Sequence, residues 1–536
     1  MNALWLMVGS IIIFIIAYAT YGAWLAKKWG VDTSKKTPAN EFNDGVDYVP
    51  TSKAVLLGHH FSSIAGAGPI NGPIQAAIFG WVPVFLWIII GSIFFGGVHD
   101  YGSLFVSIRN KGKSIGEVIN DTMGKTGKKL FSIFAWLTLV LIVAAFTNIV
   151  AATFASTPAA ATSSLLFIVL AIAFGLAVYR KGVSLKLGTV VGVILLFICV
   201  WLGNVFPIQL SVNTWIVILG IYIFIASVAP VWILLQPRDY LNSFLLYAMI
   251  IGAVVGLIVY RPSIQLDTVT SFNVGGQYLF PMLFVTVACG AISGFHSLVG
   301  SGTTSKQIDN EKDARPIGYG SMLVEGVLAV VALITAAYVS QGELSTLLEG
   351  GPVNVFSEGV GVFMSKFGIP FDVGKNFVAL AVSAFALTSL DTSTRLGRFI
   401  FQEYFEDPDK EQQSVLTNKY IATAIIVIIG CILAAGGYAK IWPIFGSANQ
   451  LLAALALMAV ALWLKKSKKS FNMITIPMIF MLIVTLSALV FLVRDNFIKA
   501  NYILVVFPVL LFILAIVLAV QGYKILFKED TSKVSH

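Results

Sequence analysis

Ionisable side chains are scarce in this sequence, yet several stand inside its apolar stretches. His59 and His60 open one such stretch, and His296 lies in another. Asp100 and Glu325 interrupt two more. An ionisable residue near the middle of a bilayer costs about 2.5–3.5 kcal/mol on insertion scales, so each is a candidate for function if these stretches span a membrane. Histidine gains and loses a proton near neutral pH, so this set of residue types suits proton exchange.

Each of these residues also has a structural interpretation. A histidine inside a membrane can be a hydrogen-bonded strut between helices, and Glu325 can be a paired strut of the same kind. Asp100 can pair with Arg109 or with another base on the same side of the membrane. We take His60, Asp100, His296 and Glu325 as candidate groups for proton coupling, with the structural interpretation kept beside them.

A third polar stretch, "LTSLDTSTRLGR" (387–398), lies at the end of an apolar run. Its hydroxyls and its carboxylate form an oxygen-rich environment that suits a hard monovalent cation such as Na⁺. We therefore add Asp391, Thr392 and Ser393 to the candidates for ion coupling. The alternative is that the hydroxyls cap the helix and that Arg395 neutralises Asp391.

The segment "GHHFSSIAGAGPINGP" (58–73) combines glycine, proline and polar residues where hydropathy expects a membrane span. Part of it recurs later in the chain, because "FSSIAGAGP" (61–69) aligns with "FHSLVGSGT" (295–303). The two spans that hold these segments are expected to cross the membrane in opposite senses. The alignment without gaps pairs Phe61 with Phe295, Ser63 with Ser297, Gly66 with Gly300, and Gly68 with Gly302.

Hydrophobic segments interrupted by glycine or proline at matching places in two inverted halves indicate the binding site of a secondary transporter. Irregular backbone at membrane depth persists only where it is buried in protein or lines a wet cavity. Freed amides at a helix N-terminus favour an anion, and freed carbonyls favour a cation. The alternative is close packing of helices through small residues. The candidate substrate-binding residues are His59, His60, Ser62, Ser63, Gly66, Gly68, Ser297, Gly300 and Gly302.

The composition places the chain in a membrane. Hydrophobic residues make up 57% of it and charged residues only 11%, whereas about a quarter of the residues of a soluble domain are charged. Apolar runs of about 18–25 residues predict an all-α protein with about fifteen transmembrane helices, two of them interrupted. Lysine and arginine gather in alternate loops, which predicts an external N-terminus and a cytoplasmic C-terminus. The net charge of +9 is thus explained by topology, without a nucleic-acid partner.

The predicted organisation has five parts. Two inverted repeats are flanked by an extra helix before them and by further helices after them. The ranges are 1–52 for an N-terminal helix and cytoplasmic loop, 53–240 for the first repeat, 241–277 for a connecting helix and outer loop, 278–465 for the second repeat, and 466–536 for the C-terminal helices and tail.

Other function classes are weighed against this pattern. A membrane receptor for an external nutrient is an alternative, but no cytoplasmic output domain is evident. An enzyme would need a nucleophile–base pair or a metal-binding motif, and neither is present in the sequence. The three cysteines show no metal-type spacing. We therefore expect a transporter with no metal and no cofactor.

The long motifs resemble those of the carbon starvation protein A family. The similarity runs without gaps from Gly58 to Ile119, and "SGFHSLVGSGTTSKQI" with "LDTSTRLGRF" is similar to later motifs of that family. The resemblance covers about residues 50–465. The motif positions carried over are Gly58, His59, His60, Ser62, Ser63, Gly66, Gly68, Pro69, Gly72, Pro73 and Asp100.

This resemblance implies a multi-pass carrier of the bacterial inner or plasma membrane, surrounded by lipid. It implies the amino acid/polyamine/organocation-type fold with inverted five-helix repeats. It also implies proton-driven uptake of short peptides or pyruvate, with Na⁺ as the alternative coupling ion. Peptide and pyruvate both present a carboxylate, so the sequence favours neither, and it leaves the oligomeric state open. The chain is shorter than the longer members of the family, so a function in their extra C-terminal region is not implied here.

Overall fold

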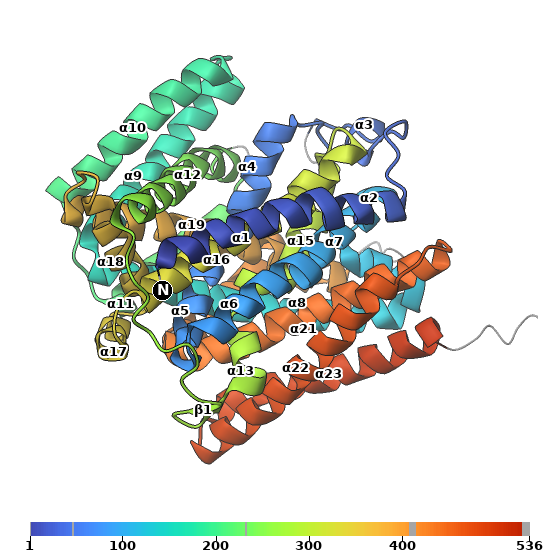
Figure 1. Ribbon diagram of the computed structural model, residues 1–536. Coiled ribbons are helices and arrows are strands. Elements are labelled where there is room, and N and C mark those ends of the chain that lie inside the picture. The colour runs from blue at the N-terminus through green and yellow to red at the C-terminus, as the bar shows by residue number, and fades with distance from the viewer. Residues whose placement is uncertain (1, 46–47, 231–232, 407–413, 528–536) are drawn as a thin grey trace, which may run out of the picture.

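The computed structural model describes residues 2–45, 48–230, 233–406 and 414–527, and they fold almost entirely into helices (Figure 1). Short π- and 3₁₀-helical turns join or extend several of them. A hairpin of two short strands, β1 (Asn273–Val274) and β2 (Gln277–Tyr278), lies in one loop. The first helices are α1 (Ala3–Ala17), α2 (Ala23–Trp29), α3 (Pro38–Glu41), α4 (Lys53–Ile64), α5 (Gly68–Ala76), α6 (Trp81–Ile90), α7 (Gly97–Arg109), α8 (Ile115–Ser156), α9 (Pro158–Gly175), α10 (Leu185–Val205), α11 (Val212–Val228) and α12 (Leu235–Tyr260). The later helices are α13 (Leu279–Thr286), α14 (Ala288–Ala291), α15 (Gly294–Gly302), α16 (Ser321–Ala337), α17 (Gln341–Glu349), α18 (Pro352–Ser365), α19 (Phe371–Phe405), α20 (Lys419–Ala434), α21 (Tyr438–Lys466), α22 (Asn472–Ile498) and α23 (Tyr502–Phe527).

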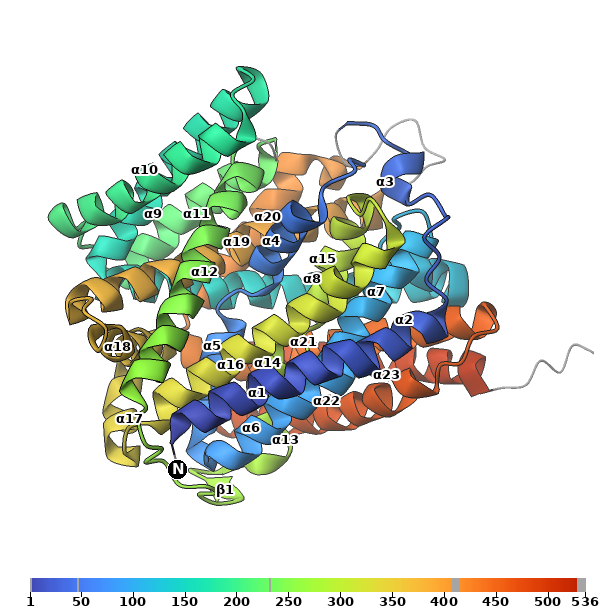
Figure 2. The same cartoon turned by 45° about the horizontal axis from the view of Figure 1, so that its top comes forward.

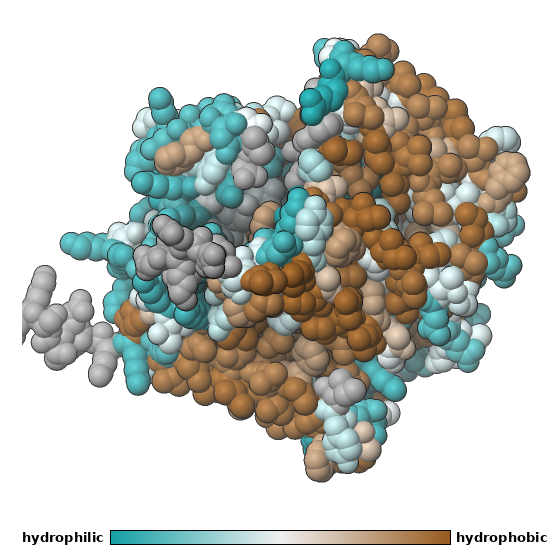
Figure 3. Space-filling model, turned by 180° about the vertical axis from the view of Figure 1, so that it is seen from behind, coloured by the Kyte–Doolittle hydropathy of each residue, from teal (hydrophilic) through white to brown (hydrophobic). Residues whose placement is uncertain are grey.

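Eleven helical segments within these described ranges are long and apolar enough to cross a membrane. The helices α11 and α20 are apolar but shorter. The helices on either side of each break are also too short to cross a membrane singly. The most apolar stretch of α21 is wholly buried, whereas only 11% of the most apolar stretch of α10 is buried. The helix α21 therefore lies in the interior and α10 at the periphery. Hydrophobic side chains cover the middle of the face seen in Figure 3, as expected for contact with lipid. The chain is a multi-pass membrane protein.

Both segments expected to be interrupted are broken. Residues 65–67 separate α4 from α5, whose second residue is Pro69, a residue type that suits the first turn of a helix. In the second segment, Ile292 and Ser293 have extended backbone between α14 and α15. Figure 2 shows α4 and α15 near the centre of the bundle.

The position of the second break differs from the one that the repeat predicts. The helix α15 runs without interruption from Gly294 to Gly302, so Gly300 lies inside it and Gly302 ends it. A Cβ atom added at Gly300 or Gly302 would meet only ordinary van der Waals contacts. A glycine weakens a helix by about 1 kcal/mol, which surrounding packing readily offsets. The prediction that unwound backbone exposes the amides of Gly300 and Gly302 is therefore wrong.

Small residues let the two interrupted segments pack closely against each other. A Cβ atom at Gly68 would lie 2.5 Å from the Sγ atom of Cys289, and one at Gly72 would lie 2.5 Å from the carbonyl oxygen of Thr286. The packing interpretation of these glycines thus holds together with the break. It applies to α5 against α13 and α14.

The end of the bundle where α2 and α7 terminate is joined by an ion pair. Arg109 pairs with Glu311 and also donates to the carbonyl of Gly30 at 2.8 Å. Glu311 accepts a further hydrogen bond from the backbone N–H of Asp32 at 2.6 Å. Arg109 is thus committed to this junction, so it does not serve as the expected partner of Asp100.

We expect Gly72→Ala to lower the thermal stability of the purified protein. The added methyl group would meet backbone rather than a flexible side chain, and overpacking of this kind costs roughly 1–3 kcal/mol. The melting temperature in detergent is the measurement. Gly342→Ala is the matched control, because Gly342 lies in α17 with open space around it. Equal melting temperatures for Gly72→Ala and the wild type would contradict the close approach of α5 and α13.

Candidate functional site

Four buried ionisable side chains, His99, Asp100, His296 and Glu325, meet beside the interrupted helices, and we call them the acid–histidine cluster. The Nδ1 atom of His99 lies 2.7 Å from Oδ1 of Asp100, and Nδ1 of His296 lies 2.7 Å from its Oδ2. The Nε2 atom of His296 lies 3.5 Å from Oε2 of Glu325. All four are buried.

Three helices bring this cluster together. His99 and Asp100 are on α7, His296 is on the first turn of α15 just after the break, and Glu325 is on α16. Three of these residues were predicted from the sequence as coupling groups, and the structure brings them into contact. His99, which precedes Asp100 in the sequence, is not among the predicted site residues.

The cluster can take up and release one proton. An ionised Asp100 accepts from both Nδ1 atoms, so His296 has its Nε2 atom left to face Glu325. A single proton shared by Nε2 of His296 and the carboxyl group of Glu325 gives either an imidazolium beside a carboxylate or a neutral imidazole beside a carboxylic acid. A second proton makes both groups protonated. No other described residue forms a hydrogen bond with the carboxylate oxygens of Glu325.

His60 extends this group from α4. Its Nδ1 atom lies 2.8 Å from Oγ1 of Thr304, which follows α15. Its Nε2 atom is buried and finds no hydrogen-bond partner among the residues that the structure describes. His60 therefore lies between the two interrupted helices, with one ring nitrogen engaged and the other available.

A second buried polar group, the arginine cluster, lies on another face of α4 and consists of Tyr222, Arg238, Asp239, Thr388 and Asp391. Arg238 pairs with Asp391 and, through Nη2 at 3.1 Å, with Asp239. Tyr222 donates to Oδ2 of Asp391 at 2.8 Å and accepts from Arg238. Thr388 lies 3.4 Å from Nη2 of Arg238. Arg238, Asp239 and Asp391 are buried.

The expected partner of Asp391 is therefore wrong. Arg395 does not neutralise it but donates to the carbonyls of Ala226 and Ala229 at 3.0 and 2.6 Å, at the end of α11. Asp391 instead meets Arg238, which comes from α12, an element distant in the sequence. Asp391 thus pairs with an arginine of another helix and not with one of α19.

The hydroxyls predicted to bind a cation do not converge. Ser393 donates to the carbonyl of Leu390 in its own helix at 3.0 Å, and Thr392 is only partly buried. Ser389, one turn earlier, is the hydroxyl that reaches the break: it lies 3.4 Å from the carbonyl oxygen of Ser63. A Cβ atom at Gly66 would lie 2.5 Å from this Ser389 hydroxyl.

The remaining predicted serines differ in their bonding. Ser63 donates to the carbonyl of His59 at 2.9 Å, and Ser297 donates to that of Gly294 at 2.7 Å, so both bond within their own helices. Ser62 is buried at the end of α4, and its hydroxyl has no partner within the described part of the chain. Of these three, Ser62 alone retains an unused hydroxyl.

The two helix N-termini at the breaks are not equivalent. Asn449 of α21 accepts from the backbone N–H of Phe295 at 2.9 Å, so a side chain of the protein caps the first turn of α15. Its Nδ2 atom also donates to Ser293 at 3.0 Å. Among the residues that the structure describes, no side chain caps α5, which begins at Gly68. The amides before and at Gly68 are thus the ones left to bind an anion.

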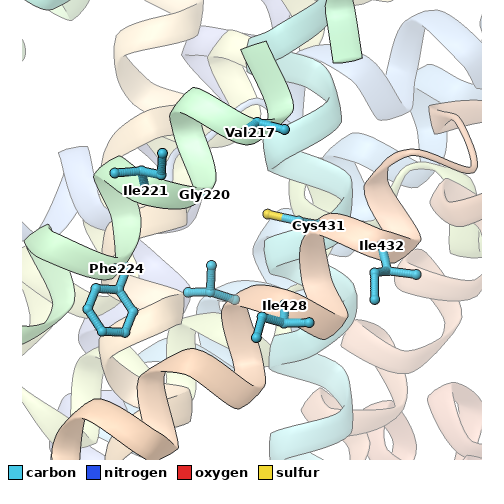
Figure 4. Close-up of a pocket in the computed structure, with 8 residues that line it drawn as sticks. Val217, Gly220, Ile221, Phe224, Ile428, Cys431 and Ile432 are labelled. Carbon is cyan, nitrogen blue, oxygen red and sulfur yellow. The ribbon is translucent and has the colours of Figure 1, made fainter. Parts of the chain in front are cut away.

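An apolar cleft of about 400 Å³ lies elsewhere, between α11 and α20 (Figure 4). Its lining includes Val217, Phe224, Ile428 and Cys431. These side chains offer neither charge nor hydrogen bonds to a polar solute, and they belong to the outer part of the bundle. We assign the cleft to lipid contact and not to the functional site.

The residues that the sequence did not single out for the site are mostly partners from distant helices. Arg238, Tyr222, Asn449 and Thr304 each contact a predicted residue or a helix end at a break. Arg238 and Asn449 were visible as polar residues at the edge of apolar runs. Nothing local identifies the helix that each one meets.

We expect Asn449→Ala to destabilise the protein, because the N–H of Phe295 would be left buried without an acceptor. Such a loss costs roughly 1–3 kcal/mol. The melting temperature of the purified protein should fall clearly. Asn496→Ala, which removes an amide that bonds only within α22, is the control and should change little. An unchanged melting temperature for Asn449→Ala would show that the α15 terminus does not need this cap.

Known proteins resemble this chain over most of its length. The family model described as carbon starvation protein CstA matches residues 2–349 and 338–488. The peptide transporter CstA of Escherichia coli (strain K12) is 34% identical, with 91% of this chain and 80% of that protein covered. The peptide transporter CstA of Bacillus subtilis (strain 168) is 33% identical, with 98% and 96% covered. The pyruvate/proton symporter BtsT of E. coli (strain K12) is 32% identical, with 91% and 81% covered.

Among solved structures, a mutant of the manganese transporter of Eremococcus coleocola has a TM-score of 0.54. It is 12% identical, and the match covers 90% of this chain and 99% of that one. This likeness concerns the fold alone, which is that of a membrane transporter. With the family model matching most of its length, the chain belongs to the carbon starvation protein CstA family.

Proposed function

We propose that the chain is a secondary active transporter that imports a small carboxylate-bearing nutrient, a short peptide or pyruvate, together with protons. The names of its relatives support this assignment, since they include peptide transporters and a pyruvate/proton symporter. The observation that supports proton coupling is the acid–histidine cluster. It buries two carboxylates and two imidazoles beside a broken helix, where they can exchange one proton.

The fold that we propose has about fifteen membrane crossings. It consists of two inverted five-helix repeats of the amino acid/polyamine/organocation type with additional helices before and after them. Support comes from the eleven long apolar helices, the two shorter apolar helices α11 and α20, and the two interrupted segments. Alternating access would then proceed by movement of one bundle relative to the other around the breaks.

The orientation that we propose places the N-terminus outside and the C-terminus in the cytoplasm of a bacterial cell, in its inner or plasma membrane. It is supported by the excess of lysine and arginine in loops on one side. The start of α1 and the end of α23 lie at opposite ends of the bundle (Figure 1), as an odd number of crossings requires.

The substrate site that we propose lies at the break between α4 and α5. The uncapped N-terminus of α5 offers the amides around Gly66 and Gly68 to a carboxylate, and Ser62 offers a hydroxyl. His59 and His60 border the same segment from α4. Ser297 belongs to the facing helix α15.

We expect Asp100→Asn and Glu325→Gln to abolish accumulation driven by a proton gradient. In proteoliposomes with an inward proton gradient, the wild type should accumulate labelled pyruvate or dialanine. The two variants should lose concentrative uptake at least tenfold and still exchange substrate across the membrane, because the proton-binding groups are neutralised and the substrate site is kept. Glu358→Gln is the control, since Glu358 pairs with Lys375 near the surface. Concentrative uptake by both variants at the wild-type rate would remove the cluster from coupling.

Sodium coupling of the same substrates is the competing proposal, favoured by the contact of Ser389 with the carbonyl of Ser63 at the end of α4. It predicts uptake that follows an imposed Na⁺ gradient at constant pH and weakens in Ser389→Ala. Proton coupling predicts that the Na⁺ gradient has no effect. Uptake measured with each gradient in turn decides between the two.

A further inference from the structure

The arginine cluster takes no part in the proton exchange proposed for the acid–histidine cluster. It is nevertheless the other large group of buried charged side chains in the described part of the chain. Burying ions without full compensation is costly, and a buried pair stabilises only when its geometry and its hydrogen bonds are complete. Here one guanidinium meets two carboxylates, Asp239 and Asp391. The environment of Arg238 is therefore strongly biased toward carboxylate.

The hydrogen bonding of this cluster is incomplete. The Nε–H group of Arg238 is buried and has no acceptor among the described residues. One oxygen of Asp391 and the amide oxygen of Asn242, which lies beside Thr388, are also buried without partners in the described ranges. A guanidinium binds a carboxylate best through two parallel N–H groups. Arg238 thus keeps a free donor next to the position that a second acceptor oxygen would take.

The arginine cluster borders the break between α4 and α5. Thr388 and Asp391 lie on one face of α19 and contact Arg238. Ser389, one of the two residues between them in sequence, contacts the carbonyl of Ser63 and approaches Gly66. Neighbouring side chains of one helical turn therefore reach both the guanidinium and the uncapped start of α5.

We propose that Arg238 binds the carboxylate of the transported substrate and that Asp391 occupies its guanidinium while no substrate is bound. This inference rests on the proposed function for the substrate class and names the residue that recognises it. The substrate's carboxylate takes the place of Asp391 on Nη1 of the guanidinium. Asp391 remains within reach of Tyr222.

The exchange balances charge when Asp391 leaves as the carboxylic acid. The proton comes from the medium and binds Asp391, so the cluster has the same net charge empty and loaded. The charged and titratable groups that face Asp391 are Arg238 and Asp239 of α12 and Tyr222 of α11. His59 of α4 lies within electrostatic reach of Asp239. Proton uptake and carboxylate binding then occur at one site.

Arg398 provides an internal comparison. It is also buried, but its guanidinium donates to the carbonyl of Ser227 at 2.8 Å and lies over the ring of Phe399. No carboxylate of the described chain pairs with it. Arg398 has the bonding of a helix-terminus cap, whereas Arg238 has that of an anion receptor held closed by a carboxylate of the protein.

The test is equilibrium binding to the purified full-length protein at pH 6 and pH 8. The probes are labelled pyruvate and dialanine, with methyl pyruvate as the uncharged analogue. The wild type should bind at least one acid, bind it more weakly at pH 8 by up to about tenfold per pH unit, and ignore the ester. Asp391→Asn should bind at both pH values with affinities that agree within about threefold, and more tightly than the wild type at pH 8.

The double variant Arg238→Gln/Asp391→Asn removes the Arg238–Asp391 pair together but leaves Asp239 without its guanidinium partner, so cooperative melting is the check that it folds. It should bind the acid about 30-fold more weakly or worse, because a desolvated charge pair is lost. Arg398→Gln should bind as the wild type does.

Wild-type affinity in the folded double variant would overturn the inference and leave the proposed transport standing. So would a pH dependence of binding in Asp391→Asn equal to that of the wild type. If the wild type neither binds nor transports pyruvate or dialanine, the proposed function fails and the inference fails with it.

Discussion

The constraint on which the structure depends is that every backbone polar group inside the membrane needs a partner from the protein or from bound solute. Breaking a helix at residues 65–67 and again at Ile292–Ser293 frees amides and carbonyls that lipid cannot satisfy. The surrounding helices answer each one locally: Asn449 caps α15, and Ser389 approaches the carbonyl of Ser63. The start of α5 has no such cap, so the same rule that stabilises the other helix ends leaves this one for a solute.

The buried charged side chains are subject to the same requirement for a partner. The buried ionisable groups near the breaks fall into the acid–histidine cluster and the arginine cluster, and within each one a carboxylate faces an opposite or convertible charge. Complete compensation would make both clusters inert struts, as in many membrane bundles. Both are incomplete: Glu325 and Arg238 keep buried polar atoms without hydrogen bonds in the part of the chain described. A buried Nε–H without a partner also occurs in Arg398, so it is the facing carboxylate that distinguishes Arg238 from an arginine that only joins helices.

Much of this arrangement could be predicted from local sequence, and the reasons for the errors are physical. Hydropathy and the glycine- and proline-rich segment located the break before α5, and bilayer cost selected Asp100, His296 and Glu325, which meet in space. The second break was misplaced because a glycine pair permits unwinding without requiring it, whereas the capping by Asn449 that fixes the real break comes from α21, far along the chain. The alternative pairings of Asp391 with Arg395 and of Asp100 with Arg109 fail for a related reason. Each alternative used a nearby opposite charge, but packing across helices brings Arg238 to Asp391 and Glu311 to Arg109 instead.

The helix α4 ties the two clusters together. His59 and His60 are consecutive, so their side chains diverge by about 100° around the helix axis. One points into the neighbourhood of Asp239 and the other contacts Thr304 near the acid–histidine cluster. The helix α4 has twelve residues and ends at the break, so a shift of α4 would not be transmitted to α5 through continuous helical backbone. Any such shift changes the surroundings of both clusters at once, so the adjacent histidines give a physical reason why proton exchange and anion exchange would be linked and not independent.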